Sequence, residues 1–300
     1  MPQRDRTVEE VIGGLASRGH GVVTRASLLE AGVTPDEIRH RLGSGALLRE
    51  HAGVYRVGHR APSLLASYLA AVWACGPGSL LSGLAAAHLL GLRRGPAPLP
   101  EVLTRTERRV PGIKTRRSRA LGVADGTTWN AIPVTTVPRT LVDLAAVLAL
   151  DDLARACHEA GVRHRTTPAQ VKRMLGRLPT APGRAKLTAV ILGDVHVTLS
   201  RLESRFLWRL RAAGLPLPET NRRAGSKRVD CRWAQHHLTV ELDSYRFHNS
   251  RYAWNQDRRR EREAYARGDQ HRRYTWGDVF EHPGPMLAEL CALLPRQRPG

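Results

Sequence analysis

Cysteine is scarce in this sequence, and the spacing of its copies argues against two ways of stabilising a fold. The four cysteines, Cys75, Cys157, Cys231 and Cys291, lie far apart in the chain and form no C-x-x-C pair. This spacing indicates neither a zinc knuckle nor a disulfide framework. Because 42% of the 300 residues are hydrophobic, ordinary apolar cores are sufficient to stabilise the chain.

Long apolar runs are also missing. The longest such stretch, from Leu64 to Cys75, is interrupted by Ser67 and is too short to span a bilayer. The first residues have the pattern of a charged helix and lack the apolar segment of a secretory signal. We therefore expect a cytoplasmic protein that makes no contact with a membrane.

Acidic residues are outnumbered by basic ones. Lys and Arg total 47 against 27 Asp and Glu, which gives a formal net charge of +20 and a sequence pI near 11.2. Such a charge favours a polyanionic partner, and nucleic acid is the first candidate. A generally Arg-rich proteome accounts for part of the excess. An acidic lipid surface is a weaker alternative, because no basic amphipathic stretch ends in an aromatic anchor.

The first 58 residues follow the order helix, helix, turn, helix and hairpin. Val8, Ile12 and Leu15 recur at helical spacing, and a second short helix begins at Thr24 and ends near Gly32. A third helix begins in the capping box formed by residues 34–37, which has Pro at the first helical position.

A two-stranded hairpin follows this third helix. Gly43 ends the helix, and the stretches 47–49 and 54–57 read as strands joined by a turn at 52–53. This order of elements predicts a winged helix-turn-helix over residues 1–58.

In a helix-turn-helix, the second helix of the pair enters the major groove of DNA. Arg39, His40 and Arg41 lie on or beside the exposed side of that helix, and Arg49 and Arg56 lie on the wing, where they suit phosphate contacts. We predict that these residues bind DNA. The alternative is that any small helical module exposes arginine, and that many winged helices bind protein instead.

Residues 59–165 alternate Ala-rich and Leu-rich helices with short strands and predict a mixed α/β middle domain, and residues 166–197 read as a short helix followed by a connector. The expected helices and strands of the middle domain are 64–75, 82–90, 101–105, 113–116 and 140–150.

Residues 198–300 predict a separate α/β domain. A capping-box match at 200–203 starts a helix that ends at Gly214. The expected elements after it are a hairpin of 229–233 and 238–243, a charged helix over 252–267, a strand over 273–276 and a helix over 285–294.

Three acidic residues fall on the expected hairpin. Because side chains alternate along a strand, Glu241 and Asp243 share the face opposite Leu238, Val240 and Leu242. Asp230 on the partner strand also opposes the apolar face. Converging carboxylates predict a hard divalent cation, Mg²⁺ or Mn²⁺, that can polarise a phosphate and activate water. The alternative is a solvated acidic face balanced by arginine.

An ordered series of motifs resembles the very-short-patch-repair-like branch of the PD-(D/E)XK nucleases. The motifs are S-R-L-E-S-R-F at 200–206, G-L-P-L-P at 214–218, R-V-D at 228–230, V-E-L-D at 240–243, D-R-R-R-E at 257–261 and Y-T-W-G-D-V at 274–279. The earlier part of the chain resembles proteins with an AbiEi-type antitoxin N-terminal domain, through V-T-R at 23–25, the wing at 48–57 and the segments 132–136 and 139–143.

The nuclease resemblance implies roles for particular residues. It implies that Asp230 and Glu241 are metal ligands and that Glu203 is an acid on a helix facing the site. Asp243 is a departure, because the family motif has Lys there to position water and stabilise phosphate charge. A cationic role then passes to His248, which suits acid or base chemistry near neutral pH, or to an arginine such as Arg258.

The sequence thus predicts an α+β multidomain protein with a winged helix-turn-helix, a mixed α/β middle region and a restriction-endonuclease-like C-terminal domain. Two functions remain open. The first is a DNA-binding, Mg²⁺-dependent endonuclease, and the second is a non-catalytic regulator or antitoxin, with a degenerate nuclease domain and a cognate toxin as a further partner.

Overall fold

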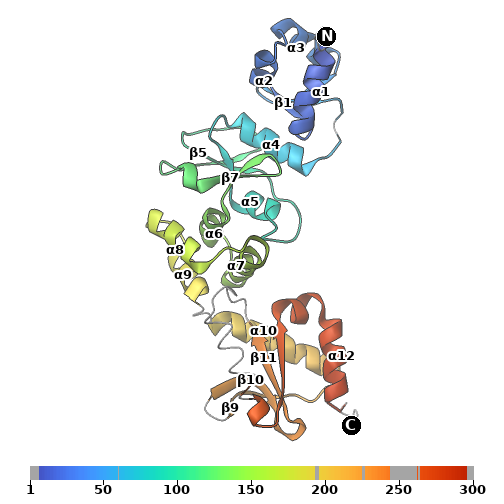
Figure 1. Cartoon of the computed structure of the whole chain (residues 1–300), viewed down its shortest axis with the longest axis vertical. Coiled ribbons are helices and arrows are strands. Elements are labelled where there is room, and N and C mark those ends of the chain that lie inside the picture. The colour runs from blue at the N-terminus through green and yellow to red at the C-terminus, as the bar shows by residue number, and fades with distance from the viewer. Residues whose placement is uncertain are drawn as a thin grey trace, which may run out of the picture. The chain divides into compact units, whose positions relative to one another are not determined.

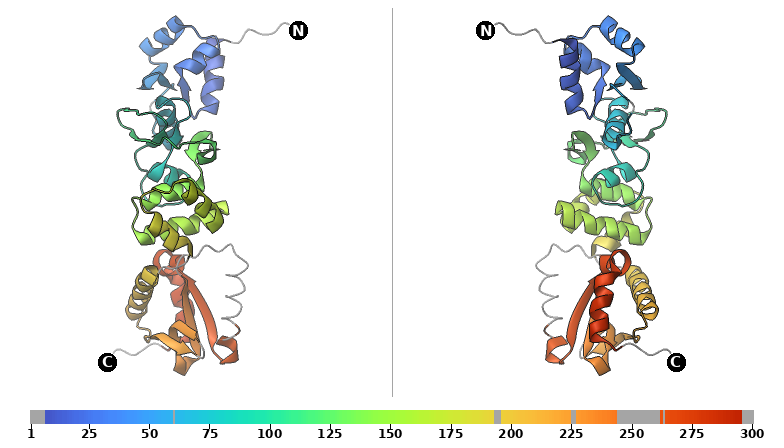
Figure 2. Two further views of the ribbon diagram at one scale, coloured as in Figure 1. Left: turned by 90° about the vertical axis from the view of Figure 1, so that its left-hand side faces the viewer. Right: turned by 90° about the vertical axis from the view of Figure 1, so that its right-hand side faces the viewer.

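The chain folds into two compact units, residues 1–144 and residues 145–300 (Figure 1, Figure 2). The computed structural model describes residues 7–59, 61–192, 196–224, 227–243, 262 and 264–295, with the backbone alone for 196–201, 221–224, 227–230 and 243. The expected mixture of helices and strands is confirmed, and three sheets are present among these residues. No helix in the described ranges is long and apolar enough to cross a membrane.

Residues 7–58 of the first unit contain three helices and an antiparallel sheet of order β1-β3-β2. The elements are α1 (Val8–Arg18), β1 (Val22–Thr24), α2 (Arg25–Glu30), α3 (Pro35–Gly43), β2 (Leu47–His51) and β3 (Val54–Val57). Their core includes the buried side chains of Ile12, Val23, Leu28, Ile38 and Tyr55. The three predicted helices and the hairpin are confirmed as elements, and β1 is an additional strand.

The rest of the first unit is built on a mixed sheet of order β6-β5-β4-β8-β7. The elements are α4 (Leu64–Ala74), β4 (Leu80–Leu81), α5 (Gly83–Leu89), β5 (Glu101–Thr104), β6 (Lys114–Arg117), η1 (Val123–Asp125), β7 (Gly126–Trp129) and β8 (Ile132–Thr135). The β5–β6 and β4–β8 pairs are parallel, and the other pairs are antiparallel. β6 is therefore an edge strand of this sheet.

The prediction of one helix over 140–150 is wrong at both ends. The structure has α6 (Val137–Ala145), a short break, and then α7 (Leu150–His164). In the break the carbonyl oxygen of Leu148 accepts a hydrogen bond of 2.6 Å from Lys186 Nζ. This bond comes from a distant part of the chain, so local helical spacing does not predict the break.

The stretch predicted as a connector contains a second helix. α8 (Pro168–Arg177) is followed by α9 (Arg184–Leu192), in which Leu187, Val190 and Ile191 are buried. The prediction of a connector at this point is wrong, because burial of this apolar side stabilises a helix directly after the Pro and Gly residues that precede it.

The last part of the second unit is a sheet of order β12-β11-β10-β9 covered on one face by two helices. Its elements are α10 (His196–Ala212), β9 (Glu219–Ala224), β10 (Lys227–Trp233), η2 (Ala234–His236), β11 (Leu238–Asp243), β12 (Gln270–Thr275), η3 (Gly277–Glu281) and α12 (Pro283–Leu293). Both views of Figure 2 draw α10 and α12 on the same side of the sheet, and their side chains share one core with β11. β11 and β12 run parallel, whereas the other pairs are antiparallel.

The predicted hairpin, final strand and final helix are confirmed, but the start of α10 is not. The helix begins at His196, so Ser200 lies inside it and does not cap it. Residues 196–199 include neither Gly nor Pro, and the helix extends through them by one turn. The charged helix predicted over 252–267 lies largely outside the described residues.

Candidate functional site

The start of α3 is fixed by the capping box that the sequence predicted. Thr34 Oγ1 accepts a hydrogen bond of 3.3 Å from the backbone N–H of Glu37, and the Thr34 backbone N–H donates one of 2.8 Å to Glu37 Oε2. These hydrogen bonds, from the backbone first and the hydroxyl second, lower the pKa of Glu37. Ile38 is buried in the core of the first 58 residues. The position of α3 is therefore fixed by its N-terminal capping box and by its buried face.

Three of the predicted DNA-binding residues are exposed on this part of the chain. Arg39 and His40 lie on α3, and Arg49 lies on β2. Arg39 Nη1 is 2.7 Å from Asp36 Oδ1, but both side chains are more than three quarters exposed. Such a surface ion pair contributes about 0–1 kcal/mol, so it does not prevent Arg39 from binding a partner.

The other two arginines predicted to contact DNA in the first unit, Arg41 and Arg56, form ion pairs within the fold. Arg41 is 14% exposed and donates a 2.5 Å hydrogen bond to Glu9 Oε1 on α1, which lowers the pKa of Glu9. Arg56 is 9% exposed and donates to Glu50 Oε1 at 2.7 Å and to the carbonyl oxygen of Ala61 at 2.8 Å. Their guanidinium groups therefore hold elements together.

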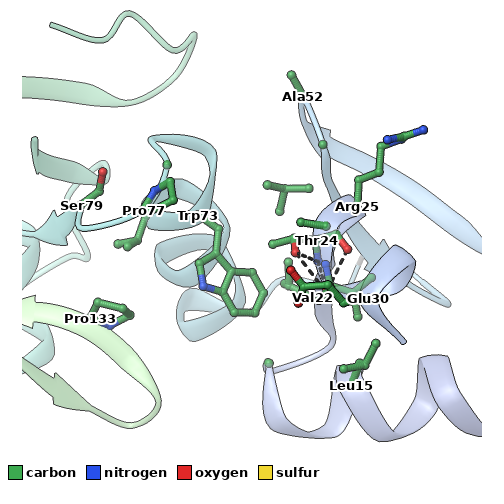
Figure 3. A pocket seen from close by; sticks show the side chains of 18 of the residues that line it. Leu15, Val22, Thr24, Arg25, Glu30, Ala52, Trp73, Pro77, Ser79 and Pro133 are labelled. Carbon is green, nitrogen blue, oxygen red and sulfur yellow. Dashed lines mark hydrogen bonds between the residues drawn. The ribbon is translucent and has the colours of Figure 1, made fainter. Parts of the chain in front are cut away.

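A hollow of about 720 Å³ lies elsewhere in the first unit and is drawn in Figure 3. The Trp73 ring lies between Pro77 and Pro133 on one side and the segment of Val22 on the other. Arg25 extends away from the ring. The hollow therefore offers an aromatic surface.

The two faces of β11 have the composition that the sequence predicted. Leu238, Val240 and Leu242 are buried in the core against α10 and α12. Thr239 and Glu241 lie on the opposite face, and both are buried as well, with Glu241 9% exposed. The side chains of Thr239 and Glu241 are therefore largely shielded from solvent.

Backbone register places two of the predicted metal ligands on neighbouring strands. Cys231 of β10 pairs with Val240 of β11; Asp230 directly precedes Cys231, and Glu241 directly follows Val240. The side chains of Asp230 and Asp243 lie outside the described set, as do residues His248 and Arg258. Among the residues whose side chains are described, no group of three or more His, Cys, Asp or Glu residues forms a metal site.

Glu203 lies on α10 and is half-buried. Its neighbours Leu202 and Phe206 pack with Val240 and Leu242 in the core. That core lies on the face of β11 opposite Glu241. α10, which carries Glu203, therefore packs on the other face of the strand from Glu241.

A buried ion pair on the polar face was not predicted. The Asp269 side chain is fully buried and accepts hydrogen bonds of 3.0 and 3.1 Å from Arg232 and one of 2.8 Å from Thr239 Oγ1. Burial alone would raise the pKa of Asp269, but the bonds from Arg232 and Thr239 outweigh it and lower the pKa. The cluster joins the residue before β12 to β10 and β11.

Two basic residues of β12 lie beside Glu241 and were also missed. In the parallel register, Arg273 is the partner of Glu241, and His271 is the partner of Thr239. His271 Nε2 is 4.0 Å from Glu241 Oε2. No local pattern in the sequence indicates these neighbours, because parallel pairing joins segments that are far apart in the chain.

Comparisons with known proteins give little further information. No protein-family model matches the chain, and no curated protein matches it. Three solved chains match, including the crystal structure of the RV2827C protein from Mycobacterium tuberculosis. That match has 21% sequence identity, covers 65% of this chain and 84% of the other, and has a TM-score of 0.35. A similarity at this level supports no conclusion about fold or activity.

Proposed function

We propose that this chain is a duplex-DNA-binding protein and that residues 7–58 are a winged helix-turn-helix whose α3 enters the major groove. The observation that carries this proposal is the exposure of Arg39 and His40 on a helix fixed from behind by the buried Ile38. The net charge of +20 supports the same partner.

Each basic residue has a distinct part in this proposal. Arg39 can leave its exposed pair with Asp36 and donate two hydrogen bonds to a guanine edge. Arg49 on β2 suits a phosphate, which positions the protein without specifying sequence. Arg41 and Arg56 act indirectly, since they hold α3 and the hairpin in place through Glu9 and Glu50.

Selection from a pool of random duplexes tests the proposal with the full chain. We expect an enriched sequence motif, and we expect Arg39→Ala to relax one position of it and to weaken binding by about 1–3 kcal/mol. Arg173→Ala, which removes an exposed charge from α8, is the matched control and should leave the motif unchanged. Failure of the chain to bind any duplex at low salt would refute the proposal.

We further propose that residues 198–300 form a PD-(D/E)XK-type site that hydrolyses DNA phosphodiesters with Mg²⁺ or Mn²⁺. The positions of Asp230 and Glu241 on neighbouring strands, each next to the Cys231–Val240 pair, favour this activity, because carboxylate oxygens are the donors that such cations prefer. When bound, the cation would supply Lewis acidity and activate water. Asp230 and Glu241 would hold it.

Arg273 of β12 provides the charge that the missing Lys would supply, and His271 provides a further hydrogen-bonding side chain. Arg273 lies beside Glu241 in register, and His271 lies 4.0 Å from it. We propose that these two residues stabilise negative charge on the phosphate, in addition to the predicted roles of His248 and Arg258. Asp243 occupies the position of the family Lys but does not supply its positive charge.

Calorimetric titration with Mn²⁺ and a cleavage assay test this second activity. Glu241→Gln should abolish both metal binding and cleavage, because it removes a charged ligand while preserving size. Asp152→Asn, at an exposed position of α7, is the control and should change neither. Metal affinity that is unchanged in Glu241→Gln would exclude Glu241 as a ligand.

A second candidate function is a non-catalytic DNA-binding regulator or antitoxin. The presence of Asp243 in place of the family Lys favours it. In that case the full chain still selects a DNA motif but cleaves no supercoiled, mismatched or single-stranded DNA with either cation, and its activity is repression or binding of a cognate toxin. The two functions are thus separated by the cleavage assay alone.

A further inference from the structure

We propose that the edge of the five-stranded sheet is a second DNA-contacting surface, which binds the phosphate backbone without reading sequence. This surface, here called the edge patch, consists of Arg105, Arg108, Arg109, Arg117 and Arg119, on β6 and the loop between β5 and β6 and just beyond β6. All five side chains are exposed. The inference rests on the proposed DNA binding and extends it to a part of the chain that the winged helix does not include.

The edge patch contains a hollow of about 310 Å³. Its walls are formed by Thr104, Glu107, Arg108, Arg109, Thr115 and Arg117. A water molecule occupies about 30 Å³ in the liquid, so a hydrated phosphate group can enter this hollow. The three guanidinium groups around this space, those of Arg108, Arg109 and Arg117, are suitable donors for phosphate oxygens.

Among the described residues, one of the five arginines of the edge patch forms an ion pair. Glu107 is the acid of the hollow, and it is 3.4 Å from Arg109 with both side chains largely exposed. The remaining basic residues of β6 are engaged elsewhere, since Lys114 pairs with Glu101 at 3.2 Å and Arg116 with the buried Asp143. Strand alternation places Lys114 and Arg116 on the face away from Thr115 and Arg117.

The hollow is also held in shape before any ligand binds. Thr115 Oγ1 donates a 2.5 Å hydrogen bond to the carbonyl oxygen of Arg108, and Thr104 Oγ1 donates one of 2.7 Å to that of Thr106. The register of β5 with β6 pairs Thr104 with Arg117. A surface fixed in this way loses less entropy on binding than a mobile loop would. Because its donors are side chains aimed at solvent from a sheet edge, it fits a backbone better than a base edge.

The salt dependence of duplex binding by the full chain tests the edge patch. In the variant Arg108→Ala/Arg117→Ala, two phosphate contacts are lost, so the slope of log K against log salt should become shallower by about 1.8. The loss of affinity should be the same on two duplexes of unrelated sequence. The variant Lys172→Ala/Arg173→Ala removes the same charge from exposed positions of α8 and should leave the slope almost unchanged. Replacing both arginines by Lys should restore most of the slope, because the charges return.

The outcomes separate this inference from the proposed function. If the edge-patch variant behaves like the α8 control while Arg39→Ala still alters the selected motif, the edge patch is overturned and the winged helix stands. If the edge-patch variant has a shallower slope of log K against log salt on both duplexes but Arg39→Ala does not alter the selected motif, the edge patch is supported and the winged helix does not read the DNA sequence. If the chain binds no duplex at low salt, both are overturned.

Discussion

Asp269 offers the sharpest test of how the polar face of the C-terminal sheet is held together. The substitution Asp269→Asn removes one charge and keeps the size of the side chain. Arg232 then loses the carboxylate to which it donates hydrogen bonds of 3.0 and 3.1 Å, and one side-chain oxygen remains for Thr239. The strand β12, which carries His271 and Arg273, is thereby less firmly joined to β10 and β11.

The size of the effect depends on burial. The side chain of Asp269 is 0% exposed, whereas that of Arg232 is 25% exposed. Removing one partner of a fully buried pair costs about 3–5 kcal/mol. Because Arg232 can recover part of its hydration, we expect a smaller loss in the free energy of unfolding, about 2–3 kcal/mol.

Urea unfolding followed by tryptophan fluorescence measures this loss, since Trp233 and Trp276 lie in the core of the same sheet. Asp152→Asn, at an exposed position of α7, is the control and should change the stability by at most about 0.5 kcal/mol. A loss in Asp269→Asn no larger than that of the control would refute the idea that this ion pair fixes β12.

The same residue predicts a dependence on pH. The folded-state pKa of Asp269 lies below its ordinary value of 3.8, mainly because Arg232 and Thr239 outweigh the effect of burial. The contribution of Asp269 is therefore complete above that value and is lost as pH falls through the lower, folded-state pKa. We expect the stability gap between the wild type and Asp269→Asn to be constant near neutral pH and to narrow only below pH 3.8.

Three further predictions concern stability. Arg139→Met leaves Asp125 and Asp143 without a buried guanidinium at 3.1 and 3.3 Å; hydrogen exchange in the first unit should show a loss of about 3–5 kcal/mol, and a loss near zero would contradict it. Thr34→Ala removes the cap of α3 and should cost about 1 kcal/mol in thermal unfolding, whereas Thr34→Ser should cost less. Gly183→Ala places a methyl group 2.0 Å from the carbonyl oxygen of Ala145, at a backbone φ of +74°. We therefore expect a lower melting temperature, and one equal to that of the wild type would contradict the described packing.

Local signals in the sequence predicted α3 and its surroundings well. The capping box at Thr34 and Glu37 involves residues three positions apart, so its hydrogen bonds follow from the sequence alone. The same motif at Ser200 gave a wrong helix start, because nothing in residues 196–199 ends the helix there. A capping box therefore indicates that a helix is near but does not fix where it begins.

Contacts between distant segments explain what the sequence did not predict. The two faces of β11 follow from alternation around Val240 and Glu241, and the structure confirms that alternation. His271 and the Asp269 ion pair depend on the parallel pairing of β11 with β12, which no short motif encodes. In the same way, the burial of Arg56 depends on its bond to Glu50, so its side chain is unavailable for the expected phosphate contact.

The position of β6 at the edge of its sheet has a consequence for solubility. An edge strand presents unpaired backbone N–H and C=O groups, which can recruit a strand from another molecule and start aggregation. The charges of Lys114, Arg116 and Arg117 oppose such an addition, because a second copy would bring like charges together. Removing charge from this strand should therefore lower the concentration at which the protein stays monodisperse, and DNA bound along the edge would protect the strand from self-association.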